Sequence, residues 1–300
     1  HGVEIPKATL CNWVRDGADQ VMPLYDALKK GILAQDIIQS DDTTVQVQEN
    51  YRSGGSKRCF LWEYRGLDGV VVFDFTTSRS RAGPSAFLAG WKGKLQADAY
   101  AGYHALYATG NVVEVGCWAH ARRYFFEALE TEPDLAVPFL ADIRRLYAVE
   151  AEARGKTPDE RNALRAEKSV PLLAEIAQLL DSCQELTLPQ NGVGKAIRYA
   201  RSNWVALNRY VEDGRLEIDN NACERQMRAV AVGRKNWLFA GSKDGGRRAA
   251  VLYSVLQSAK AAGVEPFAYL RDVLERIGTT PADRVVDLLP ANWKAARAGR

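Results

Sequence analysis

The chain has 300 residues, 47% of them hydrophobic, and its 40 Lys and Arg against 37 Asp and Glu give a formal net charge of +3. This length and apolar content are sufficient to bury the core of one large domain or two ordinary ones. Five dispersed cysteines exclude a disulfide framework, and no apolar run is long enough to cross a membrane. The sequence opens without a signal-peptide pattern, so we expect a cytoplasmic protein with no membrane contact.

The positive charge is concentrated in one region. Residues 195–248 contain 12 Lys and Arg against 6 Asp and Glu, whereas the remainder contains 28 basic and 31 acidic residues. A basic region on a nearly neutral body is typical of a protein with a polyanionic partner, although a helical surface with many salt bridges gives the same pattern. The charge is therefore compatible with nucleic-acid binding without requiring it.

Residues 1–35 are predicted to be helical, and the chain then changes to strand periodicity. The apolar residues expected to contact the core or a partner helix are Leu10, Trp13, Val14, Leu24, Leu28 and Ile32. Strands are predicted at 35–48, 59–66, 69–78, 94–103 and 111–120, with short helical segments at 84–93 and 101–110. The resulting order is β-β-β-α-β-α-β, a mixed α/β arrangement. After His120 the pattern is almost wholly helical.

The most unusual stretch is residues 217–250, EIDNNACERQMRAVAVGRKNWLFAGSKDGGRRAA. Asp and Asn before a helix-forming run indicate a helix start, because their side-chain oxygens accept from first-turn amides. Glu224 and Arg228 lie four residues apart and share a helix face. One interpretation is a carboxylate that holds a metal beside a phosphate backbone. The alternative is a capping box from Asn221 to Glu224, with no chemical role.

Two further acidic positions lie where ligands collect in α/β sheets. These are Asp41 or Asp42 within the first strand, and Asp98 at the end of the fourth. Together with Glu224 they would supply hard oxygen ligands for Mg²⁺ or Mn²⁺. Two such ions about 4 Å apart stabilise the attacking and leaving oxygens of an in-line phosphoryl displacement. Asp at strand ends is also common turn chemistry, and this alternative stays open.

Several long strings resemble the insertion-sequence 66 family of bacterial transposases, and together they span nearly the whole chain. They are SDDTTVQV around Asp41, LQADAYAGY around Asp98, VGCWAHARRYFFEAL at 115–129, IDNNACERQMR with VGRKNWLFAGS at 218–242, and LYSVLQSAKAAGVEPFAYLRDVLERI with LLPANW near the end. DNNACER followed by GRKNWLF is too long and uncommon a combination for chance similarity.

The resemblance implies a DDE transposase with an RNase H-like fold. The family's catalytic carboxylates fall on Asp41, Asp98 and Glu224, which would bind two Mg²⁺ (or Mn²⁺) ions. Cys117-Trp118-Ala119-His120 matches a C-x-x-H signature, so His120 is expected beside the active site, as is Asn221. For Cys117 and Trp118 we favour strand packing, and no second ligand pair supports zinc.

The same resemblance divides the chain into five parts. We expect a helical lead-in at 1–35, the first part of the RNase H-like core at 36–120 and a helical insertion at 121–200. The catalytic Glu helix and the closing helices of the core would occupy 201–276, followed by a C-terminal tail at 277–300.

Some residues depart from the family pattern. Asp41-Asp42-Thr43 stands where the family usually has Asp-Glu-Thr, and Asp98-Ala99-Tyr100 where it has Asp-Gly-Tyr. Ala99 would tighten the loop if that position needs a positive φ. Family members also carry a DNA-binding region before the catalytic core, and we expect specific recognition of the element's ends to depend on that region.

The predicted function is metal-dependent DNA strand cleavage and strand transfer at insertion-sequence ends, without a covalent protein–DNA intermediate. Phosphate contacts are expected from Arg122, Arg123, Arg225, Arg228, Arg234, Lys235, Arg247 and Arg248. Trp237 and Phe239 would stack on a frayed base or, as we favour, pack in the core.

Expected partners are transposon-end and target DNA, further copies of the chain on that DNA, and accessory proteins, in the bacterial cytoplasm at the nucleoid. Two alternatives remain. One is a structure-specific nuclease of the same fold, and the other is an inactive, domesticated DNA-binding protein.

Overall fold

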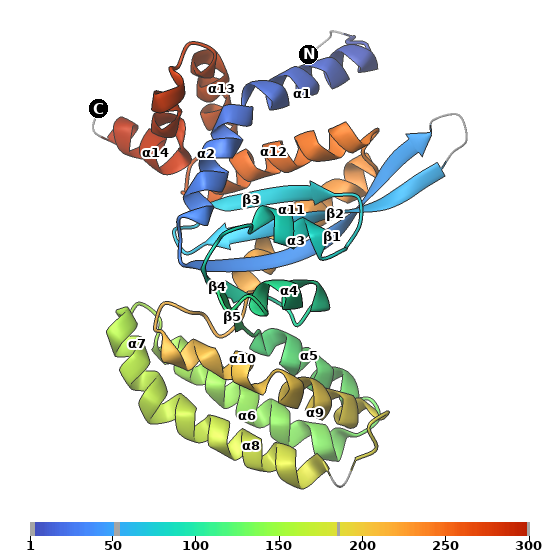
Figure 1. Ribbon diagram of the computed structural model, residues 1–300, viewed down its shortest axis with the longest axis vertical. Helices are drawn as coiled ribbons and strands as arrows, with labels where there is room; N and C mark the ends of the chain where they lie inside the picture. Colours follow the sequence, from blue (N-terminus) through green and yellow to red (C-terminus); the bar gives the residue numbers. More distant parts are fainter. Residues whose placement is uncertain (1–3, 51–54, 185–186, 299–300) are drawn as a thin grey trace. The chain divides into compact units, whose positions relative to one another are not determined.

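The computed structural model describes residues 4–50, 55–184 and 187–298 (Figure 1). The chain divides into two compact units. The first unit contains His1–Gly93, Gly102–Asn111 and Cys223–Arg300, and the second contains Lys94–Ala101 and Val112–Ala222.

The strands form a five-stranded sheet in the order β3-β2-β1-β4-β5. They are β1 (Ile37–Asn50), β2 (Gly55–Gly66), β3 (Val71–Thr76), β4 (Gly93–Gln96) and β5 (Val112–Val115). Strands β1, β2 and β3 pair antiparallel. The amides of Gly93 and Ala97 donate to the carbonyls of Asn111 and Val115 at a constant offset, which indicates a parallel pair. The sheet is therefore mixed.

Helices occupy most of the remaining chain. In the first unit they are α1 (Lys7–Gln20), α2 (Met22–Leu33), α3 (Ala82–Phe87), α4 (His104–Tyr107), nearly all of α11 (Asn221–Trp237), α12 (Lys243–Ala261), α13 (Pro266–Ile277) and α14 (Pro290–Ala298). In the second unit they are α5 (Trp118–Ala128), α6 (Pro133–Glu152), α7 (Pro158–Leu164), α8 (Val170–Gln184), α9 (Gly192–Ser202) and α10 (Trp204–Asn208). The predicted element order β-β-β-α-β-α-β is confirmed, whereas the five-part division of the chain stays a prediction.

Two predicted strands were too long, and the one expected over 94–103 ends at Gln96. The strand expected over 111–120 ends at Val115, and Trp118 and His120 lie in the first turn of α5. The Trp118 amide donates to the Ile218 carbonyl instead of extending the ladder. A short apolar run such as VGCWAH is ambiguous between strand and helix. The expectation that Cys117 and Trp118 pack within a strand was therefore wrong, although both are buried.

The two N-terminal helices bury different amounts of their apolar surface. Leu24, Leu28 and Ile32 of α2 are buried, as their spacing predicted. Trp13 and Val14 of α1 are instead 57% and 58% exposed, and Leu10 on the same helix is exposed as well. The α1 residues are thus not part of the core.

The core of the first unit lies between one face of the sheet and helices α11 and α12. It comprises Val45, Val47, Cys59, Leu61, Val71, Phe73, Phe75, Met227, Val230 and Ala250. The approach is close at Gly246, where an added Cβ would lie 2.4 Å from the Phe75 ring. Glycine at this position therefore allows α12 to contact the sheet.

Strand β3 is an edge of the sheet, and α12 runs beside it (Figure 1). Ser254 and Ser258 of α12 are buried, and their hydroxyls accept from the backbone amides of Phe73 and Val71 at 2.8 and 2.9 Å. Ser258 also donates to the Val71 carbonyl, and the Tyr25 hydroxyl donates to that of Phe73. Side chains thus satisfy backbone groups that would otherwise be buried without partners.

We expect Ser254→Ala to lower the free energy of unfolding by about 1–3 kcal/mol, because the buried Phe73 amide loses its acceptor. The measurement is urea unfolding followed by circular dichroism. Ser182→Ala, which changes an exposed serine of α8, is the control and should change stability by less than about 0.5 kcal/mol. Equal effects of the two substitutions would contradict the role assigned to Ser254.

In the second unit, α5, α6, α8 and α9 pack side by side (Figure 1). Arg165, in a π-helical segment (Arg165–Ser169), has no exposed surface. Its guanidinium donates to both carboxylate oxygens of Glu150 at 2.8 and 2.7 Å and to the carbonyls of Tyr210 and Leu216 at 2.7 and 2.8 Å. The helices thereby hold the loop that leads into α11. Within the described ranges, no helix is long and apolar enough to span a membrane.

Candidate active site

Asp41 and Asp42 lie on opposite faces of β1. Asp41 pairs with Glu63 of β2, in line with the pairs Thr43–Leu61 and Val45–Cys59 that face α11 and α12. The Asp41 carboxylate is half-buried and accepts the Asp42 amide at 2.8 Å.

Asp42 is engaged in a different contact. Its carboxylate accepts three bonds of 2.7–3.0 Å from the Arg79 guanidinium. Of the two acidic residues, Asp41 is therefore the one on the face of β1 that is turned toward α11. Its catalytic role stays a prediction.

Glu224 lies in the first turn of α11 and is half-buried. The helix begins at Asn221, so Glu224 is its fourth residue and not the third position of a capping box. The Asn221 amide donates to Asp219 Oδ1 at 3.0 Å, the acceptor of an Asx turn. By comparison, the box at Thr157 and Glu160 has both reciprocal bonds. The capping-box alternative for Glu224 is not supported.

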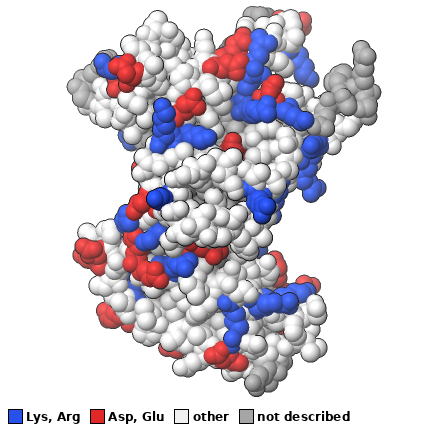
Figure 2. Space-filling view, in the orientation of Figure 1, with Lys and Arg blue, Asp and Glu red and all other residues white. Residues whose placement is uncertain are grey.

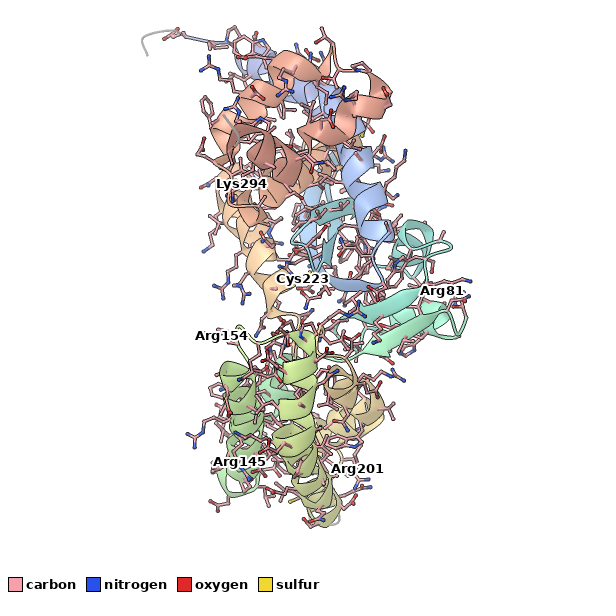
Figure 3. The ribbon with its side chains drawn as sticks, turned by 90° about the vertical axis from the view of Figure 1, so that its left-hand side faces the viewer. Arg81, Arg145, Arg154, Arg201, Cys223 and Lys294 are labelled. Carbon is pink, nitrogen blue, oxygen red and sulfur yellow. The ribbon has the colours of Figure 1, made fainter. Side chains whose placement is uncertain are left out.

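The start of α11 reaches the sheet through a buried pair of polar side chains. Cys223 and Glu63 are both fully buried, and Glu63 is the register partner of Asp41 on the neighbouring strand. Burial raises the pKa of Glu63 well above its ordinary value, and it does the same for Cys223. Cys223, labelled in Figure 3, directly precedes Glu224, so its burial fixes the start of α11 beside the residue that the family resemblance singles out.

The far end of α11 is also joined to β1. Arg234 donates to the backbone carbonyl and, at 3.0 Å, to the hydroxyl of Thr44. Beyond the helix, Leu238 has φ of +58°, an uncommon value for a non-glycine residue. After this turn Ala240 forms a parallel bridge to Val47. The Ala240 amide donates to the Gln46 carbonyl at 2.8 Å, and the Ala240 carbonyl accepts from the Gln48 amide at 2.9 Å. The GRKNWLFA string therefore docks α11 along β1.

Asp98 belongs to the second unit, directly after β4, and is half-buried. Tyr199 of α9 lies close to it. Burial raises the pKa of the Tyr199 phenol, and the nearby Cys117 and Asp98 add to this effect. Asp98 thus sits between β4 and the helices that follow in the chain.

His120 and Asn221 belong to the second unit, and each lies in the first turn of a helix. His120 is half-buried in the first turn of α5, after Cys117, whose thiol pKa burial raises to about 12. The Asn221 side chain donates to Asp219 Oδ2 at 2.7 Å, and the Tyr147 hydroxyl donates to the same oxygen at 2.7 Å. Asp219 therefore anchors the residue that starts α11.

The predicted phosphate-binding residues fall into two groups. Exposed cations are Arg122 and Arg123 on α5, Arg225, Arg228 and Lys235 on α11, and Arg247 on α12. Arg234 is engaged with Thr44, and Arg248 forms a two-bond ion pair with Asp19 at 2.8 and 3.1 Å. Basic and acidic side chains are interspersed on the face shown in Figure 2.

The aromatic residues after α11 differ in burial. Trp237 packs against the core of the first unit, as favoured from the sequence. Phe239 is 45% exposed, so core packing was the wrong expectation for that residue. A stacking role for Phe239 stays a prediction.

The acidic donors suit a hard cation. Carboxylate oxygens are the ligands that Mg²⁺ and Mn²⁺ prefer, and Asp41 and Glu224 both belong to the first unit. Over residues 4–50, 55–184 and 187–298, no three His, Cys, Asp or Glu side chains are already grouped to hold a metal ion.

Comparison with known sequences decides the family. The sequence model of the Transposase IS66 family matches residues 1–248, and that of the IS66 C-terminal element matches residues 254–291. The chain belongs to the IS66 transposase family. The resemblance identified from the motifs is confirmed, and this membership supports a transposase role.

The chain is also similar to two uncharacterized proteins of Sinorhizobium fredii (strain NBRC 101917 / NGR234). It is 35% identical to protein y4jD over 318 residues, which cover 100% of this chain and 62% of y4jD. It is 30% identical to protein y4hP over 322 residues, which cover 99% of this chain and 58% of y4hP. The chain thus spans about three fifths of the length of these relatives.

Sequence reasoning missed three residues around the predicted site. Glu63 lies in a strand whose pattern gives no sign of a buried acid, and Tyr147 is far from Asp219 in sequence. Asp219 itself stands within the IDNNACER string, but its acceptor role appears only when the start of α11 is known.

Asp213, in the loop before α11, should make stability depend on pH. Its carboxylate accepts from Lys94 of β4 at 2.6 Å and from Arg215 at 2.8 and 3.0 Å, and these contacts lower its pKa. Because folding lowers this pKa, the ionised carboxylate stabilises the fold at pH values above about 4, the pKa of an aspartate in the unfolded chain. This stabilisation is lost as the pH falls below that value.

We therefore expect Asp213→Asn to lower the free energy of unfolding by about 1–2 kcal/mol at pH 7 and by progressively less below about pH 4. Urea unfolding between pH 2.5 and 7 provides the measurement. Asp181→Asn, at an exposed pair with Arg201, is the control. A loss for Asp213→Asn that stays constant with pH would contradict the assignment.

Proposed function

We propose that this chain is the catalytic core of a DNA transposase that cuts DNA at insertion-sequence ends and joins the freed 3′-hydroxyl to target DNA. The observation that carries the proposal is membership of the IS66 transposase family over residues 1–248 and 254–291. The docking of α11 on the sheet face that carries Asp41 supports it.

The proposed fold of the core is RNase H-like. An antiparallel β1–β2–β3 meander followed by two further strands, with helices between them, supports this assignment. In this arrangement residues 121–200 are a helical insertion before the helix that carries Glu224.

Asp41, Asp98 and Glu224 would hold two Mg²⁺ (or Mn²⁺) ions in a DDE site. When bound, the ions activate a water and stabilise the attacking and leaving oxygens at a DNA phosphate. The protein's own contribution is to fix the carboxylates. The paired register of β1 and β2 fixes Asp41, and contacts at both ends of α11 fix the helix that carries Glu224.

Phosphates of the DNA would contact the exposed cations on the helix that carries Glu224, which are Arg225, Arg228 and Lys235. Arg122, Arg123 and Arg247 would extend this surface. Arg234 and Arg248 would contribute mainly by holding Thr44 and Asp19, and His120 and Asn221 would border the catalytic carboxylates.

The partners would be transposon ends, target DNA, accessory proteins and further copies of the chain, because joining two ends requires at least two active sites. The site of action would be the nucleoid in the bacterial cytoplasm.

The first test is Glu224→Gln. We expect no metal-dependent cleavage and a melting temperature within about 2 °C of wild type, because the amide keeps the size of the side chain but is a poor ligand for a hard cation. The assay uses Mn²⁺ and a duplex taken from the boundaries of the mobile element that encodes the chain. Asp41→Asn and Asp98→Asn should also abolish cleavage. Asp42→Asn, which changes the opposite face of β1, should still cleave the DNA.

The products distinguish the alternatives. A pre-cut end with a free 3′-hydroxyl should be joined to target DNA by the wild-type chain. Cleavage without joining would indicate a structure-specific nuclease, and binding without either reaction would indicate an inactive DNA-binding protein. Cleavage retained by Glu224→Gln would remove Glu224 from the site.

A second test concerns the DNA surface. Arg228→Ala should weaken DNA binding and reduce the slope of log K against log salt by about 1, because one phosphate contact releases about one counterion. Fluorescence anisotropy between 50 and about 200 mM salt measures this slope. The matched control is Arg271→Ala, which removes an exposed cation from α13. An equal change in both variants would contradict a specific role for Arg228.

A further inference from the structure

A groove between α11 and α12 brings polar and basic side chains of the first unit together. The two helices approach each other at Gly233, where an added Cβ would lie 2.4 Å from the Tyr253 hydroxyl. Beside this contact the groove has a volume of about 530 Å³. Its polar lining residues are Arg228, Asn236, Tyr253, Gln257 and Lys260.

Gln257 is a buried residue of this groove with an unusual environment. It is 5% exposed, and over the described residues its side-chain amide makes no hydrogen bond. The buried Gln96 differs, because its amide donates to the Glu217 carbonyl at 2.7 Å. A buried amide without a partner destabilises a fold, so packing alone does not explain Gln257. Water in the groove, or a ligand that displaces it, can supply the missing hydrogen bond.

The charge of the groove favours an anion. Both charged residues that line it are basic, Arg228 of α11 and Lys260 in the last turn of α12. Both are exposed, and neither forms an ion pair within the described part of the chain. Glu265, at the start of α13, has its carboxylate occupied by the amides of Phe267 and Ala268 at 3.0 and 2.6 Å. Two cations and an amide donor match the charge and the oxygen atoms of a phosphate group.

We propose that this groove binds a phosphate of the DNA backbone: the Gln257 amide donates to a phosphate oxygen, and Arg228 and Lys260 neutralise its charge. This inference deepens the proposed function and rests on it, since a DNA substrate supplies the phosphate. Arg228 lies one turn after Glu224 on α11. The groove therefore holds the DNA backbone on the same helix as the predicted catalytic carboxylate.

The test is fluorescence anisotropy of the whole chain with a labelled duplex of arbitrary sequence, without divalent cations. Backbone contacts carry no sequence information, so neither the element's ends nor catalysis enters the measurement. Lys260→Ala should reduce the slope of log K against log salt by about 1, and Lys260→Arg, which keeps the charge, should preserve the slope.

Gln257→Leu tests the amide. It should weaken DNA binding about 10-fold, because a hydrogen bond to a charged group is lost. The salt slope should stay that of wild type, because the amide carries no charge. The melting temperature should stay at or above that of wild type, because a buried polar group without a partner is replaced by an apolar one of similar size.

Two variants serve as controls. Lys30→Ala removes an exposed cation from α2 and should leave the salt slope unchanged. Ser254→Ala changes the side of α12 that bonds β3, so it should lower the melting temperature and leave DNA affinity unchanged.

An unchanged slope in Lys260→Ala, or unchanged affinity in Gln257→Leu, would overturn the phosphate site while leaving the proposed function intact. Equal effects of Lys260→Ala and Lys30→Ala on the slope would overturn it as well. A wild-type chain that binds no DNA would contradict the proposed function, and the phosphate site would fall with it.

Discussion

The attachment of α11 to the sheet is the constraint on which the candidate site depends. Near its start, Cys223 is fully buried, and toward its end Arg234 donates to the Thr44 hydroxyl at 3.0 Å. A left-handed turn at Leu238 then carries the chain back to β1, where Ala240 adds a short parallel bridge. Cys223 and Arg234 lie about three turns apart on the helix, so together they restrict sliding and rotation of α11 and define where the side chain of Glu224 begins.

In the second unit, hydrogen bonds from a buried charged side chain hold the loop that precedes α11. Arg165 is fully buried, yet Glu150 and two backbone carbonyls satisfy most of its donors. Replacement of such a group by a neutral one would leave a buried carboxylate without its partner, which is why buried pairs are costly to break. Asp213 extends the same pattern to β4 through Lys94. The helices of the second unit thus order the residues before α11 as well as forming their own core.

Local periodicity predicted the elements that bury one face, as the set Leu24, Leu28 and Ile32 shows. It failed at Trp118, where a tertiary hydrogen bond to Ile218 decides between strand and helix. The choice between Asp41 and Asp42 needed the register of β1 on β2, because both residues stand in the same alternating string. The burial of Glu63 was not predictable, because its strand pattern does not distinguish a fully buried acid from an exposed one.

The serines of α12 have a consequence for how this protein can associate. Sheets commonly recruit another chain by pairing a new strand with an open edge. At β3 the outward amides of Val71 and Phe73 already donate to the hydroxyls of Ser258 and Ser254. The helix that carries these serines, α12, covers this edge of the sheet. Strand addition there would require removal of α12 and loss of the core it covers. Any assembly of copies on this side of the first unit is therefore restricted to contacts between side-chain surfaces, and the edge is protected from the pairing that leads to aggregation.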